Sequence, residues 1–215
     1  MATNFVTQPN LTIERLTEYY SRIRKALPFC AASIAIAGGA VRDVICGKRI
    51  KDIDLFIEVW DWKDDPVRAV KEIDAVTDAL NKLFYEFGKV KSITEVLDQD
   101  AESYKNSCAK IAEVWGWPHG FHDMSWDVVF VSCDVTDYIT ESFDLGLCQA
   151  WIGFYGLKTT RQFWKDYHNK TITYLREQGS TPEQLKASQV RVRRLLEKYE
   201  GWKTRNITPA DPVTL

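Results

Sequence analysis

The chain has 215 residues, of which 45% are hydrophobic and 27% are charged, and its formal net charge is −2. This composition is typical of a soluble globular protein, and the length fits one domain or a catalytic domain with a small helical addition. The nearly neutral balance excludes a protein that attracts nucleic acid through its overall charge. Any contact with RNA must therefore come from a local basic face.

Export and membrane signals are not found in the sequence. The N-terminus lacks a basic segment followed by an apolar run, so we expect no signal peptide. No apolar window approaches the roughly 20 residues of a membrane-spanning helix. The five cysteines are scattered, and no pair has the Cys-x-x-Cys spacing of a zinc or redox site. We interpret them as buried free thiols and expect a cytoplasmic protein with no membrane partner.

The first predicted elements are a helix and a short strand. Apolar residues at helical spacing predict a helix over residues 11–26, which Pro28 ends. An apolar run predicts a strand over residues 32–37, and Gly38-Gly39 breaks this strand.

A second helix and strand follow directly. The pattern predicts a short helix over residues 40–46 with Gly47 as its C-terminal cap. A β-rich run predicts a strand over residues 53–60. An acidic pair followed by proline is a helix-start signal, and the apolar spacing extends this helix over residues 64–87. Residues 89–107 show no clear pattern.

The second half of the chain is predicted to contain two strands and two helices. The strands cover residues 110–117 and 126–132, and a loop rich in Gly, Pro and His joins them. We expect residues 136–156 to be core with a bend at each glycine. A helix through residue 168 is predicted to begin at Thr159 or Thr160, and a shorter segment follows it to residue 175.

The last predicted helix covers residues 182–199. Its start, Thr181-Pro182-Glu183-Gln184, fits a capping box with proline in the first turn. The final dozen residues are predicted to be a polar tail.

Three acidic residues have the placement expected of a metal site. Asp52 and Asp54 point to the same face of their strand, because side chains alternate along a strand with a period of two. Asp127 lies inside the apolar run 126–131, where a carboxylate is costly unless it is paired or binds metal. Gly38 and Gly39 form a turn in which the backbone can approach a phosphate.

These residues form a longer motif with a recognisable spacing. It consists of Gly38-Gly39-Ala40-Val41-Arg42-Asp43, then Gly47, then Asp52-Ile53-Asp54. The motif resembles the signature of the DNA polymerase beta-type nucleotidyltransferase superfamily. More narrowly, it is similar to the class that contains bacterial poly(A) polymerases and class II tRNA CCA-adding enzymes. The close match covers residues 34–58.

The resemblance implies a fold and a domain organisation. The fold would be an α/β (α+β) nucleotidyltransferase fold, with a small mixed sheet, packed helices and a short C-terminal helical region. Residues 1–156 would form the catalytic domain and residues 157–215 the helical region. The two could pack as one unit.

The resemblance also implies an activity. The protein would transfer a nucleoside monophosphate from ATP or CTP to an acceptor hydroxyl, with release of pyrophosphate. The expected acceptor is a tRNA-like RNA 3′ end. Two alternatives stay open: a minimal transferase that modifies a small molecule or a protein, and a non-catalytic nucleotide-binding module. The sequence does not indicate an oligomeric state.

The three acids would hold two Mg²⁺ ions in this reaction. Nucleotidyl transfer must neutralise charge on the attacking and leaving oxygens, and Mg²⁺ prefers oxygen ligands. Asp52 and Asp54 would bind the ions. The resemblance implies a third acid on a neighbouring strand, for which Asp127 is the candidate. Its rival role is an ion pair with a core Arg or Lys.

Three further residues are candidates for nucleotide binding beside Gly38 and Gly39, and a fourth, Arg191, lies in a basic stretch. Arg42 and Asp43 occupy the Arg-Asp positions of the family, where Arg42 would contact phosphate or brace the acids; a structural ion pair is an equal alternative. Asp144 matches the aspartate of the family segment Arg-Arg-Asp-Phe-Thr-x-Asn-Ala, although both arginines and the asparagine are missing here. Arg191, with its neighbours Arg193 and Arg194, either forms a solvated face or contacts phosphate or RNA.

Overall fold

The computed structural model describes residues 11–27, 33–84, 109–115, 125–176 and 180–210. Some predicted helix and strand ends lie outside these described residues, namely Pro28, residue 32, residues 85–87 and residues 116–117. Among the described helices, none is long and apolar enough to cross a lipid bilayer.

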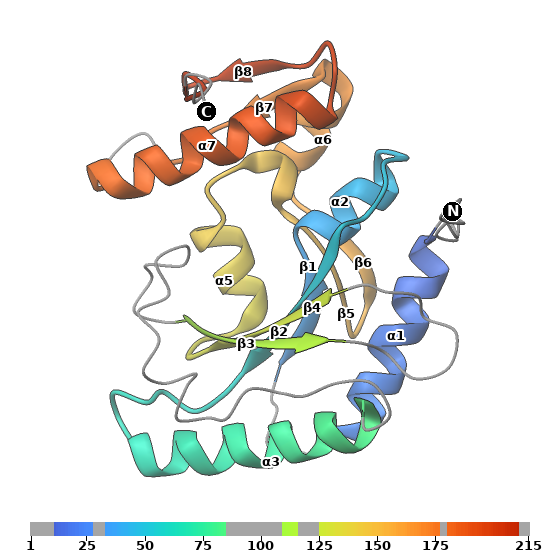
Figure 1. Ribbon diagram of the computed structural model, residues 1–215, viewed down its shortest axis with the longest axis vertical. Coiled ribbons are helices and arrows are strands. Elements are labelled where there is room, and N and C mark those ends of the chain that lie inside the picture. The colour runs from blue at the N-terminus through green and yellow to red at the C-terminus, as the bar shows by residue number, and fades with distance from the viewer. Residues whose placement is uncertain (1–10, 28–32, 85–108, 116–124, 177–179, 211–215) are drawn as a thin grey trace, which may run out of the picture.

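The centre of the molecule is a mixed sheet of six described strands (Figure 1). The strands are β1 (Ile34–Ala37), β2 (Asp52–Glu58), β3 (Ala109–Trp115), β4 (Ser125–Val131), β5 (Ala150–Gly153) and β6 (Gly156–Thr159). Their order across the sheet is β3-β4-β2-β1-β5-β6. The β2–β4 pair is parallel, and the other neighbouring pairs are antiparallel.

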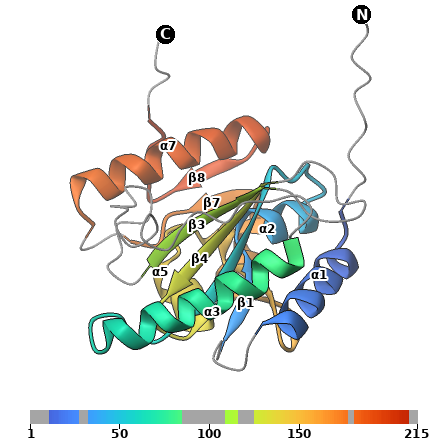
Figure 2. The same cartoon turned by 60° about the horizontal axis from the view of Figure 1, so that its bottom comes forward.

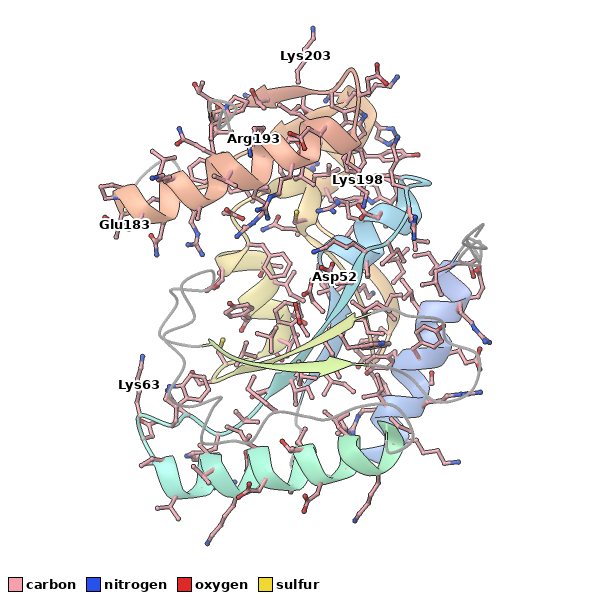
Figure 3. All side chains as sticks on the ribbon, viewed as in Figure 1. Asp52, Lys63, Glu183, Arg193, Lys198 and Lys203 are labelled. Carbon is pink, nitrogen blue, oxygen red and sulfur yellow. The ribbon has the colours of Figure 1, made fainter. Side chains whose placement is uncertain are left out.

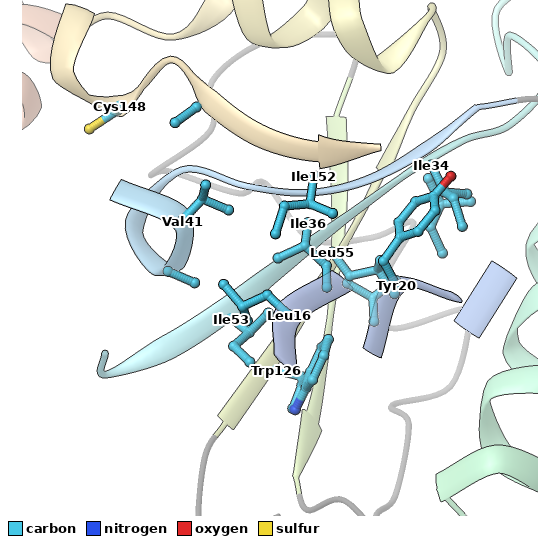
Figure 4. Close-up of a cluster of buried hydrophobic side chains, with 14 of the residues drawn as sticks. Leu16, Tyr20, Ile34, Ile36, Val41, Ile53, Leu55, Trp126, Cys148 and Ile152 are labelled. Atoms are coloured by element: carbon cyan, nitrogen blue, oxygen red, sulfur yellow. The ribbon is translucent and has the colours of Figure 1, made fainter. Parts of the chain in front are cut away.

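Helices cover both faces of the sheet. Successive side chains along a strand point to opposite faces, and here both faces carry apolar side chains. Helices α1 (Ile13–Ala26) and α3 (Pro66–Phe84) pack on the face that carries Ile53, Leu55 and Ile57 of β2. They contact one another, and Figure 2 shows them on the same side of the sheet. The short helix α5 (Val135–Ser142) packs on the other face, against Phe56 of β2. The larger cluster, drawn in part in Figure 4, joins α1 to the central strands.

The remaining elements gather at the end of the sheet where β2 begins (Figure 1). They are α2 (Gly39–Ile45), the 3-10 turn η2 (Gly146–Cys148), α6 (Arg161–Asn169), β7 (Thr171–Thr173), α7 (Pro182–Lys198) and β8 (Lys203–Arg205). Strands β7 and β8 form a separate two-stranded parallel sheet. Asp166 is fully buried in this region and accepts hydrogen bonds from Thr171 and Thr173.

Local signals predicted many of these elements correctly. The helix caps are clear examples: Thr160 caps α6, and Thr181 and Gln184 form the reciprocal capping box of α7. Gly47 follows α2 with a φ of +64°, the left-handed conformation that favours glycine after a helix. The predicted α/β fold with a small mixed sheet is confirmed.

Two predictions for the second half were incomplete. Residues 144–152 are buried, as expected of core, but residues 136–156 also contain most of α5 and the first strand of a hairpin, β5–β6. The predicted polar tail begins within β8, which pairs with β7. Helix α5 has only eight residues, and β8 only three, so neither is long enough to show a periodic pattern. The division into domains at residues 156 and 157 stays a prediction; this point is the start of β6, which is paired in the main sheet.

The core of α1 provides a direct test of this packing. Leu16 is fully buried in the larger cluster, whereas Leu185 on α7 is 38% exposed. We expect Leu16→Ala to lower the free energy of unfolding by about 3 kcal/mol, since it removes buried methyl groups and leaves a cavity. Leu185→Ala should cost less than about 1 kcal/mol. Urea denaturation measures both values, and equal losses would contradict the packing described here.

Candidate active site

Three carboxylates lie on adjacent strands of the sheet. Asp54 of β2 is directly opposite Asp127 of β4 in the parallel pair, and Asp52 precedes Asp54 by two residues on the same face. Neighbouring strands are about 4.8 Å apart, so the register alone brings Asp54 and Asp127 together. Asp52 lies at the end of β2 that faces α7 (Figure 3). The structure therefore places the three acids that the sequence singled out on one face of two neighbouring strands.

The charges of these acids act on one another. Burial, followed by the charges of Asp52 and Asp127, raises the pKa of Asp54 from 3.8 to about 7. The positive charges of Arg42 and Arg191 act in the opposite direction and reduce this rise. Asp52 is partly exposed and forms an ion pair with Lys51 at 3.3 Å. Asp54 is thus the carboxylate whose ionised form this site disfavours.

The glycine turn lies directly beside Asp54. Gly38 has a φ of +70°, and a Cβ atom built on it would lie 3.6 Å from Oδ2 of Asp54 and 3.4 Å from the ring of Phe143. Its amide donates to the carbonyl of Ala150 on β5, and α2 begins at the next residue, Gly39. The chain needs glycine at position 38 because of this backbone conformation, and the bare backbone leaves space next to the acid.

Arg42 and Asp43 form a buried ion pair that is tied to the C-terminal helix. Arg42 Nε donates to Asp43 Oδ1 at 2.7 Å and to the hydroxyl of Tyr199 at 3.1 Å. Tyr199 donates its hydroxyl proton to Asp43 Oδ1 at 2.5 Å, and Lys198 forms an ion pair with Asp43 Oδ2. Asp43 is only 2% exposed. This arrangement matches the structural alternative for the Arg-Asp pair, and a role in nucleotide binding stays a prediction.

Asp144 is bound by side chains of α7. Its carboxylate accepts a hydrogen bond from Ser188 at 2.5 Å and forms an ion pair with Arg191 at 2.5 Å. Asp144 is buried, and Arg191 is close enough to Asp54 to affect the pKa of that acid. Arg191 therefore faces the site instead of belonging to a fully solvated helix face. The nucleotide-binding role predicted for Asp144 is not tested by these contacts.

Several partners in this site were not found from the sequence. Ser188, Lys198 and Tyr199 bind acids that lie between 44 and 156 residues earlier in the chain. Cys148 accepts a hydrogen bond from Arg42 at 3.2 Å. The helical spacing of α7 indicated that Tyr199 points inward, but no local signal identified what its hydroxyl binds.

The donor atoms of the acidic site suit Mg²⁺. In the described part of the chain, no three His, Cys, Asp or Glu side chains converge as they stand into a group that could hold a metal ion. Carboxylate oxygens are nevertheless the ligands that Mg²⁺ prefers, and it completes its coordination with water or phosphate. A cation near Asp54 would favour its ionised form and so oppose the rise in pKa caused by burial and by the charges of Asp52 and Asp127. The residues fit the ion by the chemistry of their donor atoms and by their positions on neighbouring strands.

Solved structures with a similar fold are CCA-adding enzymes. A CCA-adding enzyme with ATP has a TM-score of 0.53 and 13% identity, over 90% of this chain and 38% of that chain. The Thermotoga maritima CCA-adding enzyme complexed with tRNA has a TM-score of 0.54 and 12% identity, over 94% and 43%. The Bacillus stearothermophilus CCA-adding enzyme in complex with CTP has a TM-score of 0.55 and 13% identity, over 92% and 41%.

These similarities concern the fold. The chain spans about two fifths of the length of the enzymes that it matches. No protein-family model and no curated protein sequence matches it. The likeness shows that the chain has a nucleotidyltransferase-like fold.

The raised pKa of Asp54 predicts a pH-dependent stability. Because its pKa is about 7 in the folded state and near 3.8 when unfolded, the folded protein binds more protons between these pH values. Stability contributed by the protonated acid is therefore lost as the pH rises through 7. In metal-free buffer, Asp54→Asn should raise the free energy of unfolding by roughly 2–4 kcal/mol at pH 8.5 and have little effect at pH 4.

Chemical denaturation at both pH values measures this difference. Asp78→Asn is the matched control, since Asp78 is an exposed acid on α3. An equal effect of Asp54→Asn at the two pH values would contradict the electrostatic description of the site.

The contacts of Tyr199 predict that its hydroxyl stabilises the junction between α2 and α7. Tyr199→Phe removes a donor to Asp43 and an acceptor for Arg42, both of which are buried. We expect a loss of about 1–3 kcal/mol in the free energy of unfolding. Tyr155→Phe, at an 82% exposed tyrosine, should have no measurable effect. Similar values for both variants in a urea titration would exclude the proposed role of the hydroxyl.

Proposed function

We propose that this protein is a Mg²⁺-dependent nucleotidyltransferase. It would transfer a nucleoside monophosphate from a nucleoside triphosphate to an acceptor hydroxyl and release pyrophosphate. One observation carries this proposal: Asp52, Asp54 and Asp127 share one face of the β2–β4 pair, and the Gly38 turn lies against Asp54. Acids that repel one another in this way are costly for the fold, and a cation-dependent reaction accounts for them.

The acids and the glycine turn would have different roles in this reaction. Asp52, Asp54 and Asp127 would hold two Mg²⁺ ions, which supply positive charge to the attacking and leaving oxygens. Asp127 would accept a hydrogen bond from the acceptor hydroxyl and orient it. The backbone of Gly38 and Gly39 would approach the triphosphate, since neither residue has a side chain of its own.

Arg191 is well placed to assist at the nucleotide. Its ion pair with Asp144 fixes the guanidinium, and its charge reaches Asp54. The family segment that contains the aspartate normally carries two arginines that this chain lacks. We propose that Asp144 acts in nucleotide binding by orienting Arg191, which leaves sugar and base recognition different from that of the family.

The proposed substrates are ATP or CTP and an RNA 3′ end of tRNA-like shape. Structures of the CCA-adding enzymes above contain ATP, CTP and tRNA, and this chain shares their fold. We propose a cytoplasmic location, which is supported by Cys46 and Cys148, two described cysteines that are free thiols.

A labelling experiment tests the reaction and its acceptor. The protein is incubated with Mg²⁺, total small RNA and α-labelled ATP or CTP, and the products are separated by size. We expect label in RNA and release of pyrophosphate. Label in a small molecule or in a protein would contradict the RNA acceptor while supporting nucleotidyl transfer. No Mg²⁺-dependent incorporation with any acceptor would contradict the whole proposal.

Substitution of the acids tests the site. Asp52→Asn/Asp54→Asn should reduce transfer by more than about 100-fold, because charge that develops in the transition state loses its stabilisation. The exposed-acid variant Asp78→Asn should keep full activity. Thermal melts at pH 8 provide a second readout: Mg²⁺ should raise the melting temperature of the unmodified protein but not of the double variant. Activity that survives in a folded double variant would show that the site is assigned wrongly.

A further inference from the structure

A cavity lies at the end of β1 opposite to the glycine turn. It has a volume of about 410 Å³ and opens between α1, the start of β1, the start of α5 and the tip of the β5–β6 hairpin. Ile34 and Ala35 form part of its wall, whereas Gly38 follows the other end of β1, where Ala37 pairs with Asp54 of β2. At about 3.3 Å per residue, the cavity is roughly 10 Å along β1 from the acidic site. Its size is in the range of pockets that bind small organic ligands.

Aromatic side chains dominate one part of this cavity. Phe154 and Tyr155 form the hairpin tip and are 78% and 82% exposed, although they are large apolar residues. Their rings meet edge to face with centroids 5.1 Å apart. Trp151 and Tyr20 line the cavity too, and both are buried. A hairpin turn needs no such residues, so the exposed pair indicates a surface on which a flat ring can stack.

The charged side chains of the cavity favour an anionic ligand. Arg24 of α1 and Lys158 of β6 line it, and Asp134 is the acid among its lining residues. Oδ1 of Asp134 already accepts the backbone amides of Thr136 and Asp137 at the start of α5. The ammonium group of Lys158 lies 5.8 Å from the ring centre of Tyr155, so a positive charge and an aromatic face occur side by side. Two cations against one engaged acid give the lining a net positive charge.

We propose that this cavity binds a nucleoside monophosphate unit, with its base stacked on Phe154 and Tyr155 and its phosphate held by Arg24 and Lys158. Aromatic faces next to basic side chains are the combination by which proteins bind single-stranded nucleic acid without reading its sequence. The unit is either a free nucleotide or part of an RNA strand. In the second case the cavity anchors the acceptor, and that part rests on the proposed function.

Nucleotide binding to a variant that cannot carry out the transfer tests this site separately from the reaction. In Asp52→Asn/Asp54→Asn protein, calorimetry measures the affinity for AMP, CMP and ribose 5-phosphate, and fluorescence anisotropy measures that for a labelled six-nucleotide RNA. We expect AMP and CMP to bind more tightly than ribose 5-phosphate, because the sugar phosphate has no base to stack. RNA that binds more tightly than AMP indicates a strand as the ligand, and equal affinity indicates a free nucleotide.

Three variants locate the binding. Phe154→Ala/Tyr155→Ala and Arg24→Ala/Lys158→Ala should each weaken binding by at least about 5-fold, the lower bound for loss of one stacked base. Trp164→Ala/Lys165→Ala is the matched control, since Trp164 is 40% exposed on α6 and lies outside the lining. Unchanged affinity in both cavity variants, or equal affinity for AMP and ribose 5-phosphate, would overturn the proposal. A failure of the labelling experiment would leave these affinities as they are, so the two proposals fail separately.

Discussion

Electrostatic repulsion within the β2–β4 pair is the constraint on which the site depends. The parallel register sets Asp54 opposite Asp127, and the strand period adds Asp52 on the same face. Apolar side chains on both sides of these positions keep the strands in register, with Ile53 and Leu55 on the α1 face and Phe56 on the α5 face. The core thus holds together charges that would otherwise separate. The pKa of Asp54 is raised first by burial in this core and then by the charges of Asp52 and Asp127.

The basic side chains around the acids limit this cost. Arg42 and Arg191 both act to lower the pKa of Asp54, and each is fixed by an acid of its own, Asp43 and Asp144. Because Arg191 belongs to α7 and Tyr199 follows that helix, the C-terminal region is electrostatically part of the site, although strands β2 and β4 carry the three carboxylates. Loss of α7 contacts would consequently affect both stability and the charge balance around Asp54.

How much could be predicted depended on whether the signal was local. The glycine turn, the acids of β2 and the capping box of α7 are short-range patterns, and each was recognised correctly as a structural feature. Asp127 was singled out because a carboxylate inside an apolar run is costly unless it is paired or binds metal. The partners Ser188 and Tyr199 could not be predicted, since they depend on how α7 docks.

The same limit explains the elements that were missed. Helix α5 is stabilised by packing on Phe56, and β8 by its pairing with β7; both partners lie outside the short segment itself. The Asp134 cap of α5 is a local signal, but a single cap does not by itself predict a helix of eight residues. Short elements of this kind form because tertiary packing outweighs intrinsic propensity.

The central claim is that Asp52, Asp54 and Asp127 form the metal-binding centre of a nucleotidyltransferase. A crystal structure with Mg²⁺ and a non-hydrolysable ATP or CTP analogue tests it most directly. The account predicts Mg²⁺ at about 2.0–2.1 Å from carboxylate oxygens of Asp52 and Asp54, with the triphosphate along Gly38 and Gly39. A triphosphate bound elsewhere, or ions without these carboxylates among their ligands, would contradict it.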